Sequence, residues 1–427
     1  MTPNALVSYI TNKDLDARLC ELYGEDQITH QRERYISAIK EFCELYGDDR
    51  DIGIFSVPGR SELSGNHTDH NRGCVIAASI NLDIIAVAAK RDDNIIRVKS
   101  FGYDEITVDT DTYTTPDKYM FGTSASIIAG MCQGFKNNSF NIGGFDAYMT
   151  SSVLKGSGLS SSAAFEDMIG NIENYFYNNG EVNNVEIAKL SQYAENVFFG
   201  KPCGLMDQVA CAHGGIVAID FADTSDPVIE KMDFDITAMG YKLCIVDTGG
   251  NHADLTDDYA AIPGEMKAIA KFFGKEVLRE VKESDIISSI PALRSALGDR
   301  AVLRAMHFMA ENNRVAMQKQ ALIDSDLELY FKNVIASGKS SFCYLQNVYT
   351  TKNISEQGLS IALALAEGYL ADRGGAYRVH GGGFAGTIQA YVKAEHADGF
   401  KALMNSAFGE GACLVLQIRR DGAVKVI

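Results

Sequence analysis

The stretch KGSGLSSSAA (residues 155–164) lies between a segment with strand character at 145–151 and an amphipathic segment at 160–176. In the amphipathic segment, apolar residues recur at helical spacing and share one face: Phe165, Met168, Ile169, Ile172 and Phe176. A glycine- and serine-rich loop that opens a helix directs unpaired backbone N–H groups, and the positive end of the helix dipole, toward one point. The stretch therefore predicts a binding site for phosphate or another anion.

The same stretch has a simpler interpretation as an ordinary loop whose serines cap the following helix. It is not a Walker A loop, because G-x-x-x-x-G-K-[ST] does not occur in the chain. Consecutive hydroxyl groups followed by Ala163 and Ala164 favour the anion site, since serine hydroxyls can bind phosphate oxygens or Mg²⁺. The loop alone leaves both interpretations open.

A second polar stretch, SVPGRSELSGNHTDHN (residues 56–71), follows a short expected strand at 53–57. Its donors and acceptors suit the several hydroxyl groups of a small ligand. The alternatives are a solvated loop and a metal site built on His67, Asp69 and His70. The metal site is the weaker alternative, because such ligands usually share one helix face or lie across strands.

A third stretch, AENVFFGKPCGLMDQ (residues 194–208), carries two carboxylates. Glu195 lies near the end of an expected helix at 185–199, and Asp207 follows a proline–glycine turn. Near a phosphate site, one carboxylate can hold Mg²⁺ while the other accepts or orients a proton. In a chain with 56 acidic residues, a pair of solvated surface acids is the alternative.

Composition limits the possible functions. A length of 427 residues suggests two large domains or three small ones, and a net charge of -17 disfavours nucleic acid and anionic membrane surfaces as partners. The nine cysteines form no C-x-x-C pair, and most lie in apolar surroundings, as is typical of small buried residues in proteins from a reducing compartment. We find neither a signal-peptide pattern nor an apolar run long enough to span a membrane, so we expect a cytoplasmic protein.

Both helix and strand patterns occur along the chain. Helices are expected also at 37–46 and 265–282, and the strands 84–90 and 95–99 are expected to form a hairpin through 91–94. Further strands are expected at 241–247, 378–380, 387–392 and 413–418. The mixture predicts an α+β fold, and the polar segment 220–233 is the best candidate for a domain junction.

Taken together, the three stretches resemble the galactokinase family of the GHMP small-molecule kinase superfamily in motif, order and spacing. The similarity extends to 247–259 and 379–386, and so covers most of the chain from about residue 42 onward. It implies a two-domain GHMP kinase fold with the active site in the cleft between the domains. The expected parts are an N-terminal ribosomal-protein-S5-like α/β domain (1–229) and a C-terminal ferredoxin-like α/β domain (230–427).

The resemblance also implies an activity, namely ATP-dependent phosphorylation of galactose to galactose 1-phosphate with Mg²⁺. By this resemblance Asp207 takes or orients the sugar hydroxyl proton, and Arg60 stabilises charge on the transferring phosphoryl group. The implied sugar contacts are Asn66, His67, Asp69, Gly204 and Tyr259. The implied ATP contacts are Gly156, Ser157, Gly158, Leu159, Ser160, Ser161 and Ser162. The implied Mg²⁺ ligands are Glu195 and either Ser161 or Ser162. The expected partners are a sugar and ATP, and the expected state is a monomer or small homo-oligomer.

Several positions differ from the family pattern, and most of them lie on the sugar side. Asn66 stands where the family has a glutamate that contacts the 6-hydroxyl of the sugar. An amide could donate to a 6-carboxylate that a glutamate would repel, so a kinase for galacturonate or another sugar altered at carbon 6 is an alternative. His70 and Glu62 replace a tyrosine and an asparagine, and residues 260–263 lack the paired arginines of the family.

Three rival classes can be weighed on the sequence. The run 381–386 fits G-x-G-x-x-G, but a β-rich segment follows it where a dinucleotide fold requires a helix. The chain has no G-x-S-x-G elbow, which argues against a hydrolase. A non-catalytic sugar sensor is the remaining alternative, and the presence of Asp207, Arg60 and the serine loop favours a kinase over it.

Overall fold

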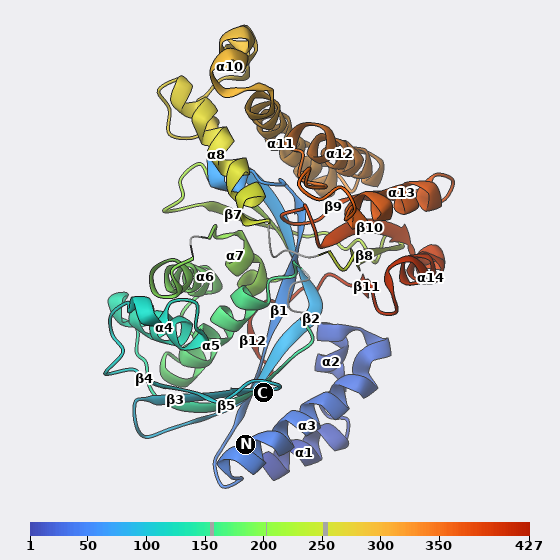
Figure 1. Ribbon diagram of the computed structural model, residues 1–427. Helices are drawn as coiled ribbons and strands as arrows, with labels where there is room; N and C mark the ends of the chain where they lie inside the picture. Colours follow the sequence, from blue (N-terminus) through green and yellow to red (C-terminus); the bar gives the residue numbers. More distant parts are fainter. Residues whose placement is uncertain (154–157, 202, 251–254) are drawn as a thin grey trace.

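The computed structural model describes residues 1–153, 158–201, 203–250 and 255–427, and they form two β-sheets with helices on their faces (Figure 1). The larger sheet has the order β12-β1-β2-β5-β3-β4, and β6 and then β7 extend it beside one half of β2. Its strands are β1 (Gly53–Ser64), β2 (Cys74–Lys90), β3 (Ile95–Ser100), β4 (Ile106–Asp109), β5 (Phe145–Ser151), β6 (Ile216–Asp220), β7 (Val228–Met232) and β12 (Val424–Lys425). All of these neighbours are antiparallel except β3 and β5, which are parallel.

The long strand β2 joins the two halves of this sheet. Its residues 74–78 pair with β6 and its residues 84–90 pair with β5. Nearly every side chain of β2 is buried, which agrees with helices or a second sheet covering both of its faces.

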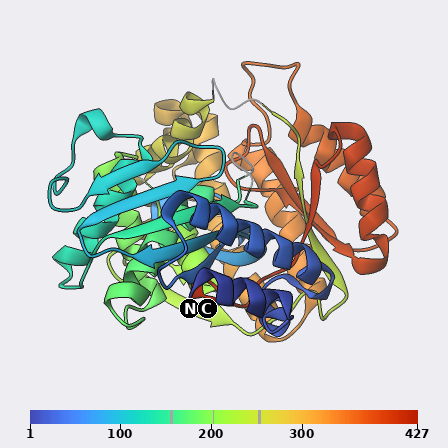
Figure 2. The same cartoon turned by 90° about the horizontal axis from the view of Figure 1, so that it is seen from below.

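Helices cover both faces of the larger sheet (Figures 1 and 2). On one face lie α4 (Ser124–Asn137), α5 (Ser161–Tyr177), α6 (Asn184–Tyr193), the π-helix at Ala194–Phe199 and α7 (Met206–His213). On the other face lie α1 (Pro3–Thr11), α2 (Asp16–Tyr23) and α3 (Ile28–Tyr46). The helix α3 buries Tyr35, Ala38, Ile39 and Phe42, which recur at helical spacing toward the sheet.

The smaller sheet is antiparallel, with the order β11-β8-β10-β9. Its strands are β8 (Tyr241–Asp247), β9 (Ala376–Val379), β10 (Thr387–Lys393) and β11 (Cys413–Leu416). The helices α13 (Gly358–Leu370) and α14 (Ala397–Phe408) cover one face. On the other face, α11 (Asp299–Ile323) and α12 (Leu327–Ser340) share a core with residues of β1, β2 and β6. The helices α8 (Thr256–Phe272), α9 (Glu283–Ser288) and α10 (Ile290–Leu297) pack with α11 in a separate cluster.

The two chain ends meet beside β1 (Figure 2). The backbone N–H of Ile52 donates to the carbonyl oxygen of Met1 at 2.9 Å, and that of Ile54 donates to the carbonyl oxygen of Ile427 at 3.2 Å. The last strand, β12, therefore returns from the smaller sheet to the larger one. The expected division between residues 229 and 230 falls within β7, and the domain boundary stays a prediction.

Most expected elements are confirmed, but two expectations are wrong. The strands β2 and β3 do not form a hairpin, because β5 enters the sheet between them and pairs with both. The helix expected at 265–282 is instead α8 (Thr256–Phe272), which stops before Gly274, where the backbone turns to a φ of 68°. Among the described residues, we find no helix with the length and apolar character that crossing a membrane requires.

Candidate active site

Asp207 and Arg60, two residues predicted to act together, form a bidentate ion pair. The Nε and Nη2 atoms of Arg60 each donate to one carboxylate oxygen of Asp207 at 2.7 Å. The hydroxyl of Ser160 donates to Oδ2 of the same carboxylate at 2.5 Å. Residues from all three sequence stretches therefore meet at Asp207, which begins the helix α7.

A bulge in β1 sets the position of Arg60. The pairing of β1 with β2 shifts between Pro58 and Arg60, and the backbone N–H of Arg60 donates to the carbonyl oxygen of Leu159 at 3.0 Å. A Cβ atom on Gly59 would lie 2.7 Å from that oxygen, so glycine permits the close approach. The Nη1 atom of Arg60 also donates to the carbonyl oxygen of Gly158. The strand thus holds both the arginine and the serine loop.

Asp207 is ionised in this arrangement. Burial alone would raise the pKa of Asp207, but the charge of Arg60 and the hydrogen bonds from Arg60 and Ser160 outweigh it and lower the pKa. The Asp207 side chain is 33% exposed, whereas Arg60 is 9% exposed. A ligand can therefore reach the carboxylate from one side without breaking the ion pair.

Residues that follow the serine loop line a cavity of about 390 Å³, whose wall combines a cluster of polar side chains, called here its polar end, with a larger apolar part. Ser161, Ser162, Glu166, Glu195 and Lys201 line the polar end. The rest of the wall is largely aliphatic and aromatic and includes Phe101, Tyr103, Ile106, Ile127, Met149, Phe165 and Phe199. Such a cavity suits a ligand with an anionic group and a flat apolar group.

Glu195 and Glu166 face each other across the amide of Gln208. The Nε2 atom of Gln208 donates to Oε2 of Glu195 at 3.0 Å and to Oε2 of Glu166 at 3.1 Å. Burial, followed by the charge of Glu195, raises the pKa of Glu166 well above its ordinary value. Oε1 of Glu166 has no hydrogen-bond partner among the described residues. Glu166 is not among the site residues predicted from the sequence. It lies four residues after Ser162, so both side chains share one face of α5.

Two of the expected sugar contacts, His67 and Asp69, belong to one hydrogen-bonded chain. Nε2 of His67 lies 2.9 Å from the carbonyl oxygen of Gly382, and its Nδ1 lies 3.1 Å from Nε2 of His70. Nδ1 of His70 lies 3.1 Å from Oδ1 of Asp69. Burial, and then the neighbouring His70, lowers the pKa of His67 to about 3, so His67 is neutral and donates through Nε2.

Gly204 and Tyr259 adjoin the same group. A Cβ atom on Gly204 would lie 2.6 Å from Oδ2 of Asp69, which brings Asp69 close to the turn before Asp207. The hydroxyl of Tyr259 donates to the carbonyl oxygen of Gly383 at 2.8 Å. The expected sugar contacts therefore gather around the 381–386 loop next to Asp207.

Asn66, the remaining expected sugar contact, differs from the others because protein groups take up all of its hydrogen bonds. Its side chain is fully buried, and Nδ2 donates to Oε1 of Glu62 at 3.2 Å and to the carbonyl oxygen of Gly381 at 2.7 Å. Its Oδ1 accepts from Ser341 at 3.1 Å and from Asn347 at 2.9 Å. All four hydrogen-bonding positions of the amide are thus occupied by protein. The expectation that this side chain contacts a sugar is contradicted by its burial and bonding.

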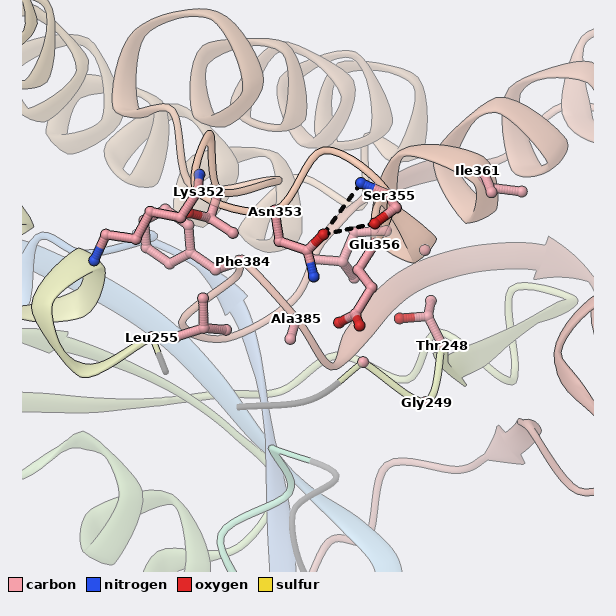
Figure 3. Close-up of a pocket in the computed structure, with 14 residues that line it drawn as sticks. Thr248, Gly249, Leu255, Lys352, Asn353, Ser355, Glu356, Ile361, Phe384 and Ala385 are labelled. Atoms are coloured by element: carbon pink, nitrogen blue, oxygen red, sulfur yellow. Dashed lines mark hydrogen bonds between the residues drawn. The ribbon is translucent and has the colours of Figure 1, made fainter. Parts of the chain in front are cut away.

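A second cavity, of about 470 Å³, is lined by residues of the segments 248–255, 350–361 and 384–385 (Figure 3). Its walls include Thr248, Lys352 and Phe384, and the Phe384 ring packs edge-on against Tyr259 with 5.3 Å between centroids. None of the predicted site residues among the described ones lines it.

Two predicted ATP contacts, Gly156 and Ser157, lie outside the described residues. The others lie together: Leu159 and Gly158 bind Arg60 through their carbonyl oxygens, Ser160 binds Asp207, and Ser161 and Ser162 line the first cavity. Within the described part of the chain, no three histidine, cysteine, aspartate or glutamate side chains are grouped as a metal site, so the metal site weighed for His67, Asp69 and His70 gains no support.

Comparisons with known proteins identify the class of kinase. Residues 126–215 match the N-terminal domain of GHMP kinases, and residues 40–90 match the galactokinase galactose-binding signature. The fold is similar to a crystal structure of mevalonate kinase, with a TM-score of 0.61 at 14% identity over 86% of this chain and 98% of that chain. Fold and motifs together define a two-domain α+β kinase of the GHMP class.

Proteins with similar sequences identify the family within this class. The galactokinase of Streptomyces coelicolor is 31% identical over 376 residues, which cover 86% of this chain and 92% of that protein. The galactokinase of Glaesserella parasuis is 32% identical over 375 residues, which cover 85% and 91% of the two chains. The crystal structure of Lactococcus lactis galactokinase complexed with galactose has a TM-score of 0.76 at 24% identity and covers 92% of this chain and 100% of that one. The chain belongs to the galactokinase family.

Proposed function

We propose that this chain transfers the terminal phosphoryl group of ATP to galactose and forms galactose 1-phosphate and ADP. The observation that carries the proposal is the meeting of Arg60, Ser160 and Asp207, one residue from each of the three sequence stretches. An in-line phosphoryl transfer needs this arrangement, because the phosphate and the hydroxyl must approach each other from opposite sides of one point.

The first cavity suits ATP and Mg²⁺. Glu195, Ser161 and Ser162 offer carboxylate and hydroxyl oxygens, which are the donors that Mg²⁺ prefers. The unpartnered Oε1 of Glu166 beside them fits a nearby cation. When bound, ATP supplies the phosphoryl group and Mg²⁺ neutralises part of its charge. The serine loop, at the start of α5, directs backbone N–H groups toward the phosphates.

Asp207 and Arg60 act on the two reacting groups. Because Arg60 holds the pKa of Asp207 below its usual range, the carboxylate is a weak base but a fixed negative charge. We infer that Asp207 orients the attacking hydroxyl and accepts its proton late, as the loose transition state of phosphoryl transfer permits. Arg60 lies beside the serine loop, where it stabilises charge on the transferring group.

His67, Asp69, Gly204 and Tyr259 are proposed to hold the sugar. The alternative substrate, galacturonate, depended on a free Asn66 amide, and the burial of Asn66 removes that argument. The alternative of a non-catalytic sensor is not favoured either, since the Arg60–Asp207 pair is intact.

Replacing Asp207 by asparagine tests the proposal. The Asp207→Asn variant keeps the shape of the side chain, so ATP binding should be unchanged, while galactose-dependent ADP release should fall by about 10²–10⁴-fold. A coupled ADP-release assay, with calorimetric titration of ATP, measures both quantities. An Asp207→Asn enzyme that turns over like the wild type would contradict the assigned role. A wild-type chain without galactose-dependent ADP release would contradict the activity itself.

We also propose that the chain works in the cytoplasm as a monomer or small homo-oligomer, with a sugar and ATP as its partners. The free cysteines and the net charge of -17 support this setting. Light scattering of the purified protein would determine the oligomeric state.

A further inference from the structure

Lys201 lies at the polar end of the first cavity. It follows Gly200, which ends the π-helix, and its backbone N–H donates to the carbonyl oxygen of Glu195 at 3.1 Å. Its Nζ atom lies 3.1 Å from Oε1 of the same residue. The Glu195 side chain is 4% exposed, whereas that of Lys201 is 65% exposed. The ammonium group thus covers a buried carboxylate from the open side of the cavity.

The described lining of this cavity has more acidic than basic side chains, which is unfavourable for an anionic ligand. Among the described residues that line it, Glu166 and Glu195 are acidic and Lys201 is the sole basic side chain. Arg60, the arginine of the predicted site, is already paired with Asp207. The phosphates of a nucleotide would add negative charge beside Glu195, and a side-chain cation that can change partners would help Mg²⁺ to balance it.

Stability alone does not account for the contact between Lys201 and Glu195. Ion pairs between solvent-exposed side chains contribute about 0.2–1 kcal/mol, and the Lys201 side of this pair is largely exposed. The other oxygen of Glu195 is already held by Gln208, whose amide lies inside the protein. Lys201 is therefore not required to fix Glu195, and it is free to serve a ligand.

We propose that Lys201 is a nucleotide-binding residue that exchanges Glu195 for an oxygen of the distal phosphates when ATP binds. The inference rests on the proposed function, because it takes ATP as the occupant of the cavity. Lysine suits the exchange, since a compact charge on a flexible stem can change partners without moving the backbone. If Lys201 moves away, Oε1 of Glu195, which it contacts in this structure, would become available to Mg²⁺.

Calorimetric titration of the full chain with ATP and with AMP tests this inference, with and without Mg²⁺. In the Lys201→Met variant, the affinity for ATP should fall about tenfold, as expected for the loss of one charge-assisted contact to phosphate. The affinity for AMP should stay within about twofold, because AMP lacks the distal phosphates. Lys201→Arg keeps the charge and should retain most of the affinity for ATP. Lys189→Met removes an equal charge outside the cavity, where Lys189 pairs with Asp226, and should bind ATP like the wild type.

Two results would overturn the inference. One is a Lys201→Met variant that binds ATP as tightly as Lys189→Met does. The other is an equal loss of affinity for ATP and AMP, which would indicate a general disturbance of the cavity. Neither result depends on turnover, so a failure of the proposed kinase activity would be recognised separately by the absence of galactose-dependent ADP release in the wild type.

Discussion

Replacing Asn66 by aspartate should destabilise the fold rather than change the choice of sugar. The Nδ2 group of Asn66 donates to Oε1 of Glu62 at 3.2 Å and to the carbonyl oxygen of Gly381 at 2.7 Å. Aspartate has nearly the same shape, but an ionised carboxylate would place an acceptor against both of these acceptors. The buried aspartate should therefore take up a proton.

The loss of unfolding free energy can be worked out from this protonation. Keeping an aspartate protonated at pH 7, when its ordinary pKa is about 3.9, costs about 1.4 kcal/mol for each pH unit, or about 4 kcal/mol in total. A protonated carboxyl can still donate to Gly381 but no longer to Glu62, and the lost hydrogen bond adds about 1 kcal/mol. We expect the Asn66→Asp variant to lose about 5 kcal/mol of unfolding free energy at pH 7.

The loss should depend on pH with a definite sign. The folded pKa of the new aspartate lies above its unfolded value, so the folded state binds more protons and loses stability as the pH rises between the two. At about pH 5 the deficit should shrink to roughly 2–3 kcal/mol. Urea unfolding followed by far-UV circular dichroism measures it, because the chain has no tryptophan for fluorescence.

The control is Asn4→Asp, which makes the same substitution at an exposed position and should change the free energy of unfolding by less than about 0.5 kcal/mol. The reasoning would be refuted if Asn66→Asp were as stable as Asn4→Asp. A changed ratio of kcat/KM for galactose and galacturonate, in a stably folded Asn66→Asp enzyme, would also refute it by showing that the side chain faces the sugar.

Three further predictions concern the ion pairs and the sugar side. Arg60→Lys loses the bidentate contact with Asp207 and should lower kcat about 10–100-fold with little change in the affinity for ATP, as single-turnover kinetics and calorimetry would show. Gly204→Ala places a Cβ atom 2.6 Å from Oδ2 of Asp69 and should raise the KM for galactose about tenfold, whereas Gly264→Ala, with nothing within 4 Å, should leave it unchanged. Asp83→Asn leaves two arginines partly unpaired and should cost about 3–5 kcal/mol of unfolding free energy at neutral pH. Burial alone would raise the pKa of Asp83, but these arginines outweigh it and lower the pKa, so the difference from the wild type should shrink only as the wild type loses this stability below about pH 4.

Helices and strands that depend on residues close together in the sequence were predictable. The strands β5 and β8 begin and end where the sequence places them, and the helix after the serine loop begins within one residue of its expected start. Alternating or helically spaced apolar residues predict the type of the element that contains them, because the pattern lies within that element. The insertion of β5 between β2 and β3 was not predictable in this way, because β5 lies more than forty residues further along the chain than β3.

Residue types and motif order in the sequence by themselves determined the chemistry: an anion-binding loop, a carboxylate that can meet a hydroxyl, and an arginine to stabilise charge. Only the tertiary structure decided which polar groups remain free to act. It placed the Asn66 amide in a closed network, and it brought Glu166 and Lys201 to the cavity of the serine loop. The physical reason is that hydrogen bonds and charges depend on distance in space and on burial, and partners such as Asn66 and Asn347 are 281 residues apart in the sequence.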